Sequence, residues 1–234
     1  LFYLFFFSCS ENRPGLEFKY GYFVNENTVL FRLHSPNSSN VYLVIFDEYY
    51  DDFGKEYKME RMDSGDWEIE LDSLGIGTYY GYRLEGPLNN SSVIVADPYS
   101  KSAVTQNNFR HVAKSLIIDE SFNWGNDSWS KLKMHDLIIY EAHLRDMTID
   151  KTSEAKHKGT FKGFIDIGQK GGIEHLKNLG VNAIQFLPLW DFANFEIPYK
   201  VDTVGFFNDW NPYERNHWGY MPTFFMAPES YYAS

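Results

Sequence analysis

Hydrophobic and polar residues alternate in short runs through the first half of the chain, which is typical of strands with one buried face. In one run Val29, Phe31 and Leu33 fall on the same face. Runs of the same kind lie at residues 41–46, 67–72, 79–84, 93–95 and 116–118. Turns rich in Gly, Pro, Asn and Asp separate them. This spacing predicts an immunoglobulin-like β-sandwich over residues 16–120, followed by a connector at 121–133.

The pattern changes in the second half of the chain. Residues 137–142 form a continuous apolar run, which is typical of a strand buried on both faces of a parallel sheet. A helix is expected over residues 169–179, ended by Gly180, and residues 181–187 form a second apolar run. The apolar residues of the expected helix are Ile173, Leu176 and Leu179. Strand, helix and strand in this order predict a parallel, right-handed βαβ unit.

Long loops follow both predicted strands of this unit, at residues 143–168 and from Pro188 onward. In a βα barrel the loops after the strands form the active face. A whole barrel needs about 250 residues, and residues 134–234 are fewer than half of that. We therefore expect this region to be the first part of a (β/α)8 TIM barrel, and the chain to be a fragment of a longer protein.

The first residues have the pattern of a targeting segment. An apolar stretch, residues 1–7, is followed by Ser8, Cys9 and a polar segment up to Gly15. This order is typical of the end of an export signal and resembles a bacterial lipoprotein signal, in which the cysteine is acylated. We therefore expect residues 1–15 to be a truncated signal and tether with Cys9 as the lipid anchor, which attaches the protein to a membrane of the bacterial cell envelope or outside the cell. The alternatives are a buried thiol on a strand and a cytoplasmic location.

The composition of the chain excludes some classes of binding partner. The 234 residues carry 21 Lys and Arg against 32 Asp and Glu, a formal net charge of −11. No nucleic acid is expected as a partner, because such binding requires a basic face, whereas a neutral ligand meets no such objection. The single cysteine excludes an internal disulfide framework and a thiolate zinc site. The aromatic share of 18% requires either a bulky core or surfaces that bind flat apolar faces.

Ordered motifs over residues 16–234 resemble the α-amylase superfamily, glycoside hydrolase family 13, and within it the pullulanase, isoamylase and glycogen-debranching branch. Motifs similar to those of the barrel are 140–146 (YEAHLRD), 159–163 (GTFKG), 172–181 (GIEHLKNLGV), 185–192 (QFLPLWDF) and 216–222 (NHWGYMP). Motifs similar to those of the starch-binding-like sandwich before the barrel are 31–36 (FRLHSP), 65–68 (GDWE), 77–83 (GTYYGYR) and 96–101 (ADPYSK). The resemblance implies a glycoside hydrolase that acts on starch, glycogen or pullulan, by debranching at α-1,6 bonds or by α-amylase-like cleavage.

The resemblance also implies where catalysis takes place. Retaining glycosidases use two carboxyl groups about 5 Å apart. In the family the nucleophile, the acid/base and a supporting Asp lie on barrel strands four, five and seven. We therefore assign no catalytic residue to this chain and expect it to be inactive alone. Glu141 and Asp146 flank the end of the first barrel strand with His143 and Arg145, and we expect a structural ion pair there rather than an acid/base couple.

The candidate substrate-binding residues are Asn216, Trp218 and Tyr220. By resemblance Tyr220 stacks on the sugar before the scissile bond, and Trp218 packs to hold the loop, with a sugar contact as the alternative. Asn216 and His217 stand where pullulanases usually show a Tyr–Asn pair, which leaves the linkage preference open. Trp190, Asp191 and Asn194 are on the same face but are expected not to contact sugar, and Trp210 and Tyr213 are either outer platforms or loop core.

Other candidates are interpreted as structural. In the sandwich, Trp67, Tyr80 and Tyr82 share the inward parity of their strands and are expected in the core rather than on a starch platform. No cofactor is expected; a calcium ion at Asp202, Asn208 and Asp209 is the weaker alternative to a solvated loop.

Three functions remain open on the sequence alone. The first is an α-glucan hydrolase that binds a polysaccharide or oligosaccharide. The second is a non-catalytic glucan-binding surface protein, and the third is a branching or trehalose-releasing relative of the hydrolases.

Overall fold

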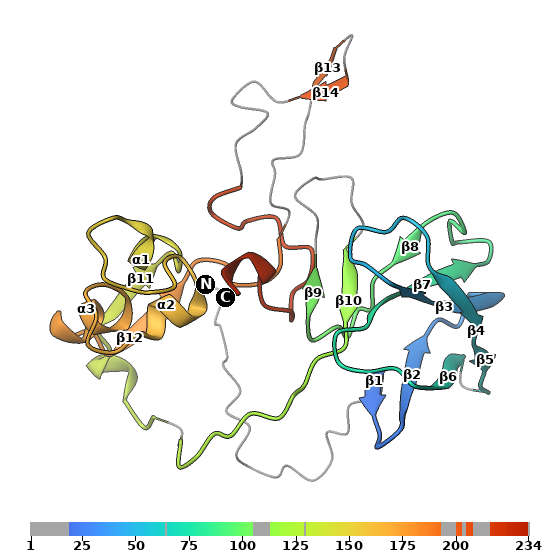
Figure 1. Ribbon diagram of the computed structural model, residues 1–234, viewed down its shortest axis with the longest axis horizontal. Coiled ribbons are helices and arrows are strands. Elements are labelled where there is room, and N and C mark those ends of the chain that lie inside the picture. Colours follow the sequence, from blue (N-terminus) through green and yellow to red (C-terminus); the bar gives the residue numbers. More distant parts are fainter. Residues whose placement is uncertain are drawn as a thin grey trace.

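The computed structural model describes residues 19–63, 65–104, 113–128, 130–192, 200–202, 205–207 and 216–233. A sandwich of two antiparallel sheets is followed by a parallel strand pair with short helices, and the last segment of the chain lies between these two parts (Figure 1). The expected signal and tether, with Cys9, lie outside the described residues. In the described part of the chain, no helix has the length and apolarity needed to cross a membrane.

Two sheets form the predicted sandwich. The first sheet has the order β1 (Gly21–Val24), β2 (Thr28–His34), β6 (Asp66–Asp72), β5 (Glu60–Arg61). The second has the order β4 (Lys55–Lys58), β3 (Asn40–Phe46), β7 (Tyr79–Glu85), β10 (Lys114–Leu116), β9 (Ala103–Val104), with β8 (Ile94–Val95) also paired to β7. Neighbouring strands run antiparallel throughout. The sandwich is therefore confirmed. The predicted position of its last strand, residues 116–118, is wrong, because β10 ends at Leu116.

The core of the sandwich follows from the alternation along its strands. Val29 and Phe31 are fully buried on β2, and Val41 and Leu43 are fully buried on β3. In the register, Phe31 is opposite Ile69 and Leu43 is opposite Tyr82, so apolar side chains share the inner faces. Burial of such side chains contributes about 1.5–3 kcal/mol each relative to exposure. The same parity that predicts the strands thus builds one continuous core between the sheets.

A buried carboxylate links the aromatic core to the loop after β8. Asp97 is fully buried and accepts hydrogen bonds from the Tyr80 hydroxyl (2.8 Å) and the Tyr99 amide (2.8 Å), while its own amide donates to Ser115 Oγ (3.0 Å). Burial raises the pKa of Asp97, and the hydrogen bond from Tyr99 opposes that rise. A buried polar group of this kind is tolerated because its partners are in place.

The second part of the chain contains the expected βαβ unit. It consists of a 3-10 turn η1 (Met134–Asp136), β11 (Ile139–Ala142), α1 (Asp146–Ile149), α2 (Phe161–Ile165), α3 (Gly172–Asn178) and β12 (Ala183–Phe186). Strands β11 and β12 are parallel, as predicted. The expectation of burial on both faces is wrong for β11, since Ile139 is 60% exposed. In the described part of the chain β12 is its only partner strand, and the apolar cluster with the helices covers one face.

Helix α3 is followed by the glycine cap that the sequence predicts. Gly180 has φ of +77°, its amide donates to the Lys177 carbonyl, and the Val181 amide donates to the Leu176 carbonyl. This is the pair of bonds of a Schellman motif, which satisfies the last carbonyls of the helix. Leu176 faces the core as expected, but Leu179 is 56% exposed, so its assignment to the apolar face is wrong. The helix begins three residues later and ends one residue earlier than expected, at Gly172 and Asn178, and Leu179 is the cap.

The last described segment, residues 216–233, packs between the two parts of the chain. Phe224 and Ala227 form a buried cluster with Ala103 of β9 and Ala113, which precedes β10. A 3-10 turn, η2 (Ser230–Tyr232), places Tyr232 in the cluster of the βαβ unit. Figure 1 shows this segment between β9 and α2, with the antiparallel pair β13 (Lys200–Asp202) and β14 (Gly205–Phe207) preceding it in the chain.

We predict that Asp97→Ala lowers the free energy of unfolding by about 3 kcal/mol, because the buried Tyr80 hydroxyl loses its acceptor. Asp97→Asn keeps an acceptor for the Tyr80 hydroxyl and lowers the free energy of unfolding by less. Urea unfolding followed by circular dichroism measures both, with exposed Asp47→Ala as the matched control. Since the folded pKa of Asp97 is raised above an unfolded value of about 3.9, the wild type loses stability relative to Asp97→Asn as pH rises through the folded pKa. If Asp97→Ala lowers the free energy of unfolding no more than Asp47→Ala does, Asp97 does not stabilise the sandwich as the buried acceptor for Tyr80.

Candidate functional site

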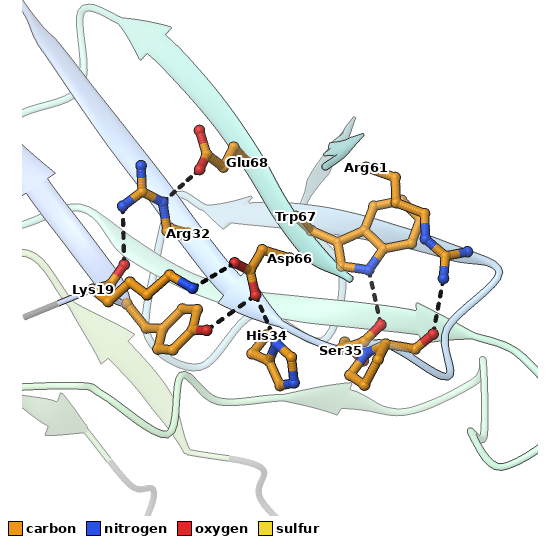
Figure 2. Close-up of polar contacts among 10 residues, drawn as sticks. Lys19, Arg32, His34, Ser35, Arg61, Asp66, Trp67 and Glu68 are labelled. Atoms are coloured by element: carbon orange, nitrogen blue, oxygen red, sulfur yellow. Dashed lines mark hydrogen bonds and ion pairs between the residues drawn. The ribbon is translucent and has the colours of Figure 1, made fainter. Parts of the chain in front are cut away.

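The sandwich aromatics considered as sugar platforms are core residues, as predicted. Tyr80 and Tyr82 are fully buried, and Trp67 is 2% exposed. Figure 2 shows Trp67 beside Ser35, whose carbonyl accepts a hydrogen bond from the indole Nε1 at 2.9 Å, and the Arg61 guanidinium lies 5.5 Å from the ring. A ring covered in this way is not available to stack on a sugar.

Asp66, next to Trp67, fixes the start of the sandwich. Its carboxylate is nearly buried and contacts Lys19 Nζ at 3.0 Å, the Tyr20 hydroxyl at 3.1 Å and His34 Nδ1 at 2.6 Å (Figure 2). These contacts tie the segment before β1 to the first residue of β6. The 65–68 motif therefore has a structural role in this molecule.

A groove of about 500 Å³ lies at the edge of the sandwich. Its lining combines apolar and polar side chains, among them Phe23, Asn25, Lys101 and Glu120. The Lys101 ammonium pairs with Glu120 within this lining. The Arg32 guanidinium lies 6.0 Å from the centroid of the Phe23 ring, so only the part of that ring that faces the groove could stack on the C–H face of a sugar, while polar groups bond its hydroxyls.

A polar cluster forms where β11 ends. His143 is 8% exposed, and its Nδ1 lies 3.2 Å from Asp146 Oδ2 at the start of α1. Asp146 also contacts His217 Nε2 at 3.1 Å, and the Tyr232 hydroxyl lies 3.1 Å from His143 Nε2. Burial lowers the pKa of His143, which favours the neutral imidazole. Burial alone would raise the pKa of Asp146, but the hydrogen bond from His217 and the two nearby imidazoles hold it below its usual value.

The loop at residues 216–222 is shaped from within. Asn216 is buried, and its side-chain oxygen accepts a hydrogen bond from the Gly219 amide at 3.2 Å. Gly219 has φ of +75° and lies so close to Phe192 that an added Cβ would be 3.1 Å from the ring. This conformation favours glycine. The turn leaves Trp218 and Tyr220, on either side of Gly219, 60% and 63% exposed.

The three candidate substrate-binding residues differ in exposure and in the contacts that they make within the loop. Tyr220 is available for stacking, as its expected role requires. Trp218 is exposed rather than packed, so of its two expected roles the sugar contact fits the structure better. Asn216 uses its amide oxygen inside the loop, where it positions Gly219. No structural observation tests a sugar contact of any of the three, and these roles stay predictions.

Buried groups hold the segments around the loop. Asp191 is fully buried, and its backbone carbonyl accepts hydrogen bonds from the Thr223 amide (2.7 Å) and the Phe224 amide (3.2 Å). The Glu229 carboxylate, 1% exposed, accepts hydrogen bonds from the Phe192 amide (2.9 Å) and the Tyr231 amide (2.7 Å). Burial raises the pKa of Glu229. The loop after β12 is therefore connected to the last segment by polar contacts.

Two of the residues expected not to contact sugar are described. Trp190 is half-buried against Phe225, with ring centroids 5.5 Å apart, and Asp191 is buried, while the absence of a sugar contact stays a prediction. Glu141 is exposed on β11, so the polar contacts at the end of this strand join Asp146 to the two histidines and do not include Glu141. Asn194, Asn208, Asp209, Trp210 and Tyr213 lie outside the described residues, as does the side chain of Asp202.

The polar contacts around the loop were not anticipated from the sequence. The His-x-x-Asp spacing at residues 143–146 was a visible signal, because it allows an i,i+3 pair at the start of a helix. The partner His217 is 71 positions further along the chain, and no local pattern indicates that contact. The Glu229 carboxylate likewise accepts a hydrogen bond from the Phe192 amide, 37 residues away, which no local pattern indicates.

Comparison with known proteins identifies the class of the sandwich. Residues 18–100 match the family model described as Carbohydrate-binding module 48 (Isoamylase N-terminal domain). The first part of the chain is therefore a carbohydrate-binding module 48 domain.

The chain as a whole has homologues among α-glucan debranching enzymes of glycoside hydrolase family 13, namely isoamylases, GlgX homologues and pullulanases. It is 28% identical over 244 residues to Isoamylase 1, chloroplastic, of Arabidopsis thaliana, covering 94% of this chain and 30% of that protein. It is 34% identical over 173 residues to Malto-oligosyltrehalose trehalohydrolase of Saccharolobus solfataricus, covering 74% of this chain and 26% of the relative.

A solved structure shows the same similarity. A mutant pullulanase from Paenibacillus barengoltzii, complexed with maltotetraose, superposes with a TM-score of 0.69 at 27% identity, covering 91% of this chain and 32% of that chain. The chain thus spans about a third or less of the length of these relatives. The similarity extends over both the sandwich and the βαβ unit.

We predict that Gly219→Ala destabilises the chain by more than about 1–2 kcal/mol, the cost of a left-handed backbone alone, because the added methyl group also meets the Phe192 ring. Gly180→Ala is the matched control, since Gly180 has a similar φ but open space around the Cβ position. Trp218→Ala and Tyr220→Ala should change stability by less than about 0.5 kcal/mol, as expected for exposed side chains. Urea unfolding compares the four variants. Equal losses for the two glycine variants would show that the contact with Phe192 does not constrain the loop.

Proposed function

We propose that this chain is part of an α-glucan debranching glycoside hydrolase, in which a carbohydrate-binding module 48 sandwich precedes the first strands of a (β/α)8 barrel. The observation that carries the proposal is the collinear similarity of 94% of the chain to an isoamylase. The parallel pair β11 and β12, with a helix between them, is the repeating unit of such a barrel. The exposed side chains of Ile138 and Ile139 leave apolar surface for further strands to cover.

The loop at 216–222 supplies the sugar contact in this proposal. Exposed aromatic rings can stack on the C–H faces of glucose, and the polar cluster at the end of β11 lies beside the same loop. Tyr220 would stack on the sugar before the scissile bond, with Trp218 as a second platform. Their place after β11 and β12 agrees with a site on the carboxyl-terminal face of the barrel strands.

The cleavage itself requires carboxyl groups from elsewhere in the polypeptide. A retaining mechanism needs a nucleophile and an acid/base about 5 Å apart. Of the two carboxylates at the end of β11, Asp146 is engaged by two histidines and Glu141 is exposed. Neither pairs with the other, so this chain would bind and orient glucan while the remainder of the barrel cleaves it.

The first test of the proposal uses the polypeptide encoded by the complete gene. It should release reducing ends from pullulan and amylopectin, and very little from amylose. Tyr220→Ala should lower kcat/KM at least tenfold, a loss of about 1.4 kcal/mol of transition-state stabilisation, whereas Tyr220→Phe keeps the stacking face and most of the activity.

No activity on any of the three glucans would reject the proposal. Release of trehalose from a maltooligosyl-trehalose would instead favour the trehalose-releasing alternative, which the similarity to the Saccharolobus enzyme keeps open. Activity unchanged in Tyr220→Ala would remove the loop from the site.

A second candidate function is glucan binding by the sandwich alone. The groove beside Phe23 and the match to a carbohydrate-binding module favour it. In affinity electrophoresis of the 234-residue chain through amylopectin, this candidate predicts that Phe23→Ala abolishes retardation while Tyr220→Ala does not. The enzymatic proposal predicts that Tyr220→Ala abolishes retardation while Phe23→Ala does not. Phe53→Ala is the control, since that ring is 91% exposed and lies outside both surfaces.

A further inference from the structure

Three potential metal ligands converge from two distant segments of the chain. His143 follows β11, Asp146 begins α1, and His217 belongs to the 216–222 loop. His143 Nδ1 and His217 Nε2 lie 3.2 Å and 3.1 Å from the same oxygen, Asp146 Oδ2. One ligand atom from each residue falls within 4.8 Å of the other two. Two imidazoles and a carboxylate form a donor set that suits zinc.

Two of the three distances between ligand atoms are close to those around a tetrahedral ion. Zn²⁺ binds imidazole nitrogen and carboxylate oxygen at about 2.0–2.2 Å, so two ligands of one tetrahedral ion are about 3.3–3.5 Å apart. The two distances at Asp146 are within a few tenths of an ångström of that range. Calcium is disfavoured here because it prefers six to eight oxygen ligands.

The buried histidine is oriented as a ligand. His143 is more than nine-tenths buried, and its Nδ1 faces the cluster without a well-aligned hydrogen bond in the structure. Its other nitrogen, Nε2, lies 3.1 Å from the hydroxyl of Tyr232, which is itself 3% exposed. When Nε2–H donates to that hydroxyl, the Nδ1 lone pair points at the cluster. Metal-binding histidines are commonly held in this way by a partner on the other nitrogen.

The opposite side of the cluster is open to solvent. The side chains of Asp146 and His217 are 52% and 49% exposed. Solvent can therefore reach a fourth coordination position, and an ion can enter without rearrangement of the core. The cluster thus offers three ligands, a supported histidine and an entry path.

We propose that His143, Asp146 and His217 bind one divalent zinc ion, with Tyr232 as the partner that orients His143. The bound ion ties the 216–222 loop to the end of β11 and so fixes the loop that presents Trp218 and Tyr220. The proposal does not depend on the action of the protein on glucan, because the ligands and their geometry are independent of any sugar. It departs from the expectation that the chain has no cofactor.

Zinc binding is tested on the 234-residue chain without an affinity tag, after treatment with EDTA. Isothermal titration with ZnCl₂ should give one ion per chain. His217→Asn and Asp146→Asn should each weaken binding at least tenfold, and Tyr232→Phe about tenfold through loss of the orienting partner. The control is His135→Asn, because His135 is an exposed histidine 3.6 Å from Asp136 and should leave the affinity within twofold of the wild type.

Cobalt provides a second readout. Co²⁺ in a site with tetrahedral geometry gives strong visible absorption, which the wild type should show and His217→Asn should lose. Circular dichroism confirms that the variants are folded, which is expected because His217 and Asp146 are half-exposed. Absence of saturable zinc binding, or equal affinity in the wild type and His217→Asn, overturns the proposal and leaves the cluster as a set of hydrogen-bonded side chains. Measured without glucan, these outcomes are independent of the enzymatic assays.

Discussion

The contact between Asp146 and His217 joins two segments that are 71 residues apart, and the geometry of the candidate sugar-binding loop depends on it. One segment is the end of a strand in a parallel pair, which the hydrogen-bond register with β12 holds in place. The other is a loop whose internal support comes from Asn216 and Gly219. The aromatic rings of the loop are exposed, so their packing does not hold the loop in its conformation. Polar anchors at the base of the loop do so instead.

Around this contact, buried hydrogen-bond acceptors hold segments that lack regular secondary structure. Glu229 satisfies two backbone amides, and the Asp191 carbonyl satisfies two more. Asp97 has the same function in the sandwich, where it joins Tyr80 to the loop after β8. Each of these acceptors is costly to bury, and hydrogen-bond donors from neighbouring and distant residues compensate that cost. Irregular segments with such anchors can be as well defined as strands, which suits loops that bind ligands.

The sandwich packs against the last segment of the chain rather than standing apart from it. The small cluster of Ala103, Ala113, Phe224 and Ala227 is formed by residues from both parts. The 216–233 segment therefore contacts the sandwich on one side and, through Tyr232, the βαβ unit on the other. The sandwich therefore supports the segment that follows the 216–222 loop through an apolar contact.

The local sequence pattern predicted the structural features that depend on a few neighbouring residues. The alternation at Val29, Phe31 and Leu33 gave the correct inner face, and Gly180 gave the correct helix end, because side-chain parity and glycine conformation act over a few residues. The resemblance to the family located the exposed Tyr220. The sequence did not predict the contacts of Asp97, Glu229 and His217, since each joins positions that only the tertiary fold brings together. It also misjudged Ile139, because an apolar run indicates a tendency to be buried but does not identify the neighbour that covers it.

Hydrogen–deuterium exchange of the 216–222 segment, compared between the wild type and Asp146→Ala, tests the anchoring of the loop most directly. The account predicts faster exchange in this segment, including the Gly219 amide, while β3 and β7 of the sandwich keep their protection. Unchanged exchange in residues 216–222 would contradict it, because the loop would then keep its geometry without the contact to Asp146.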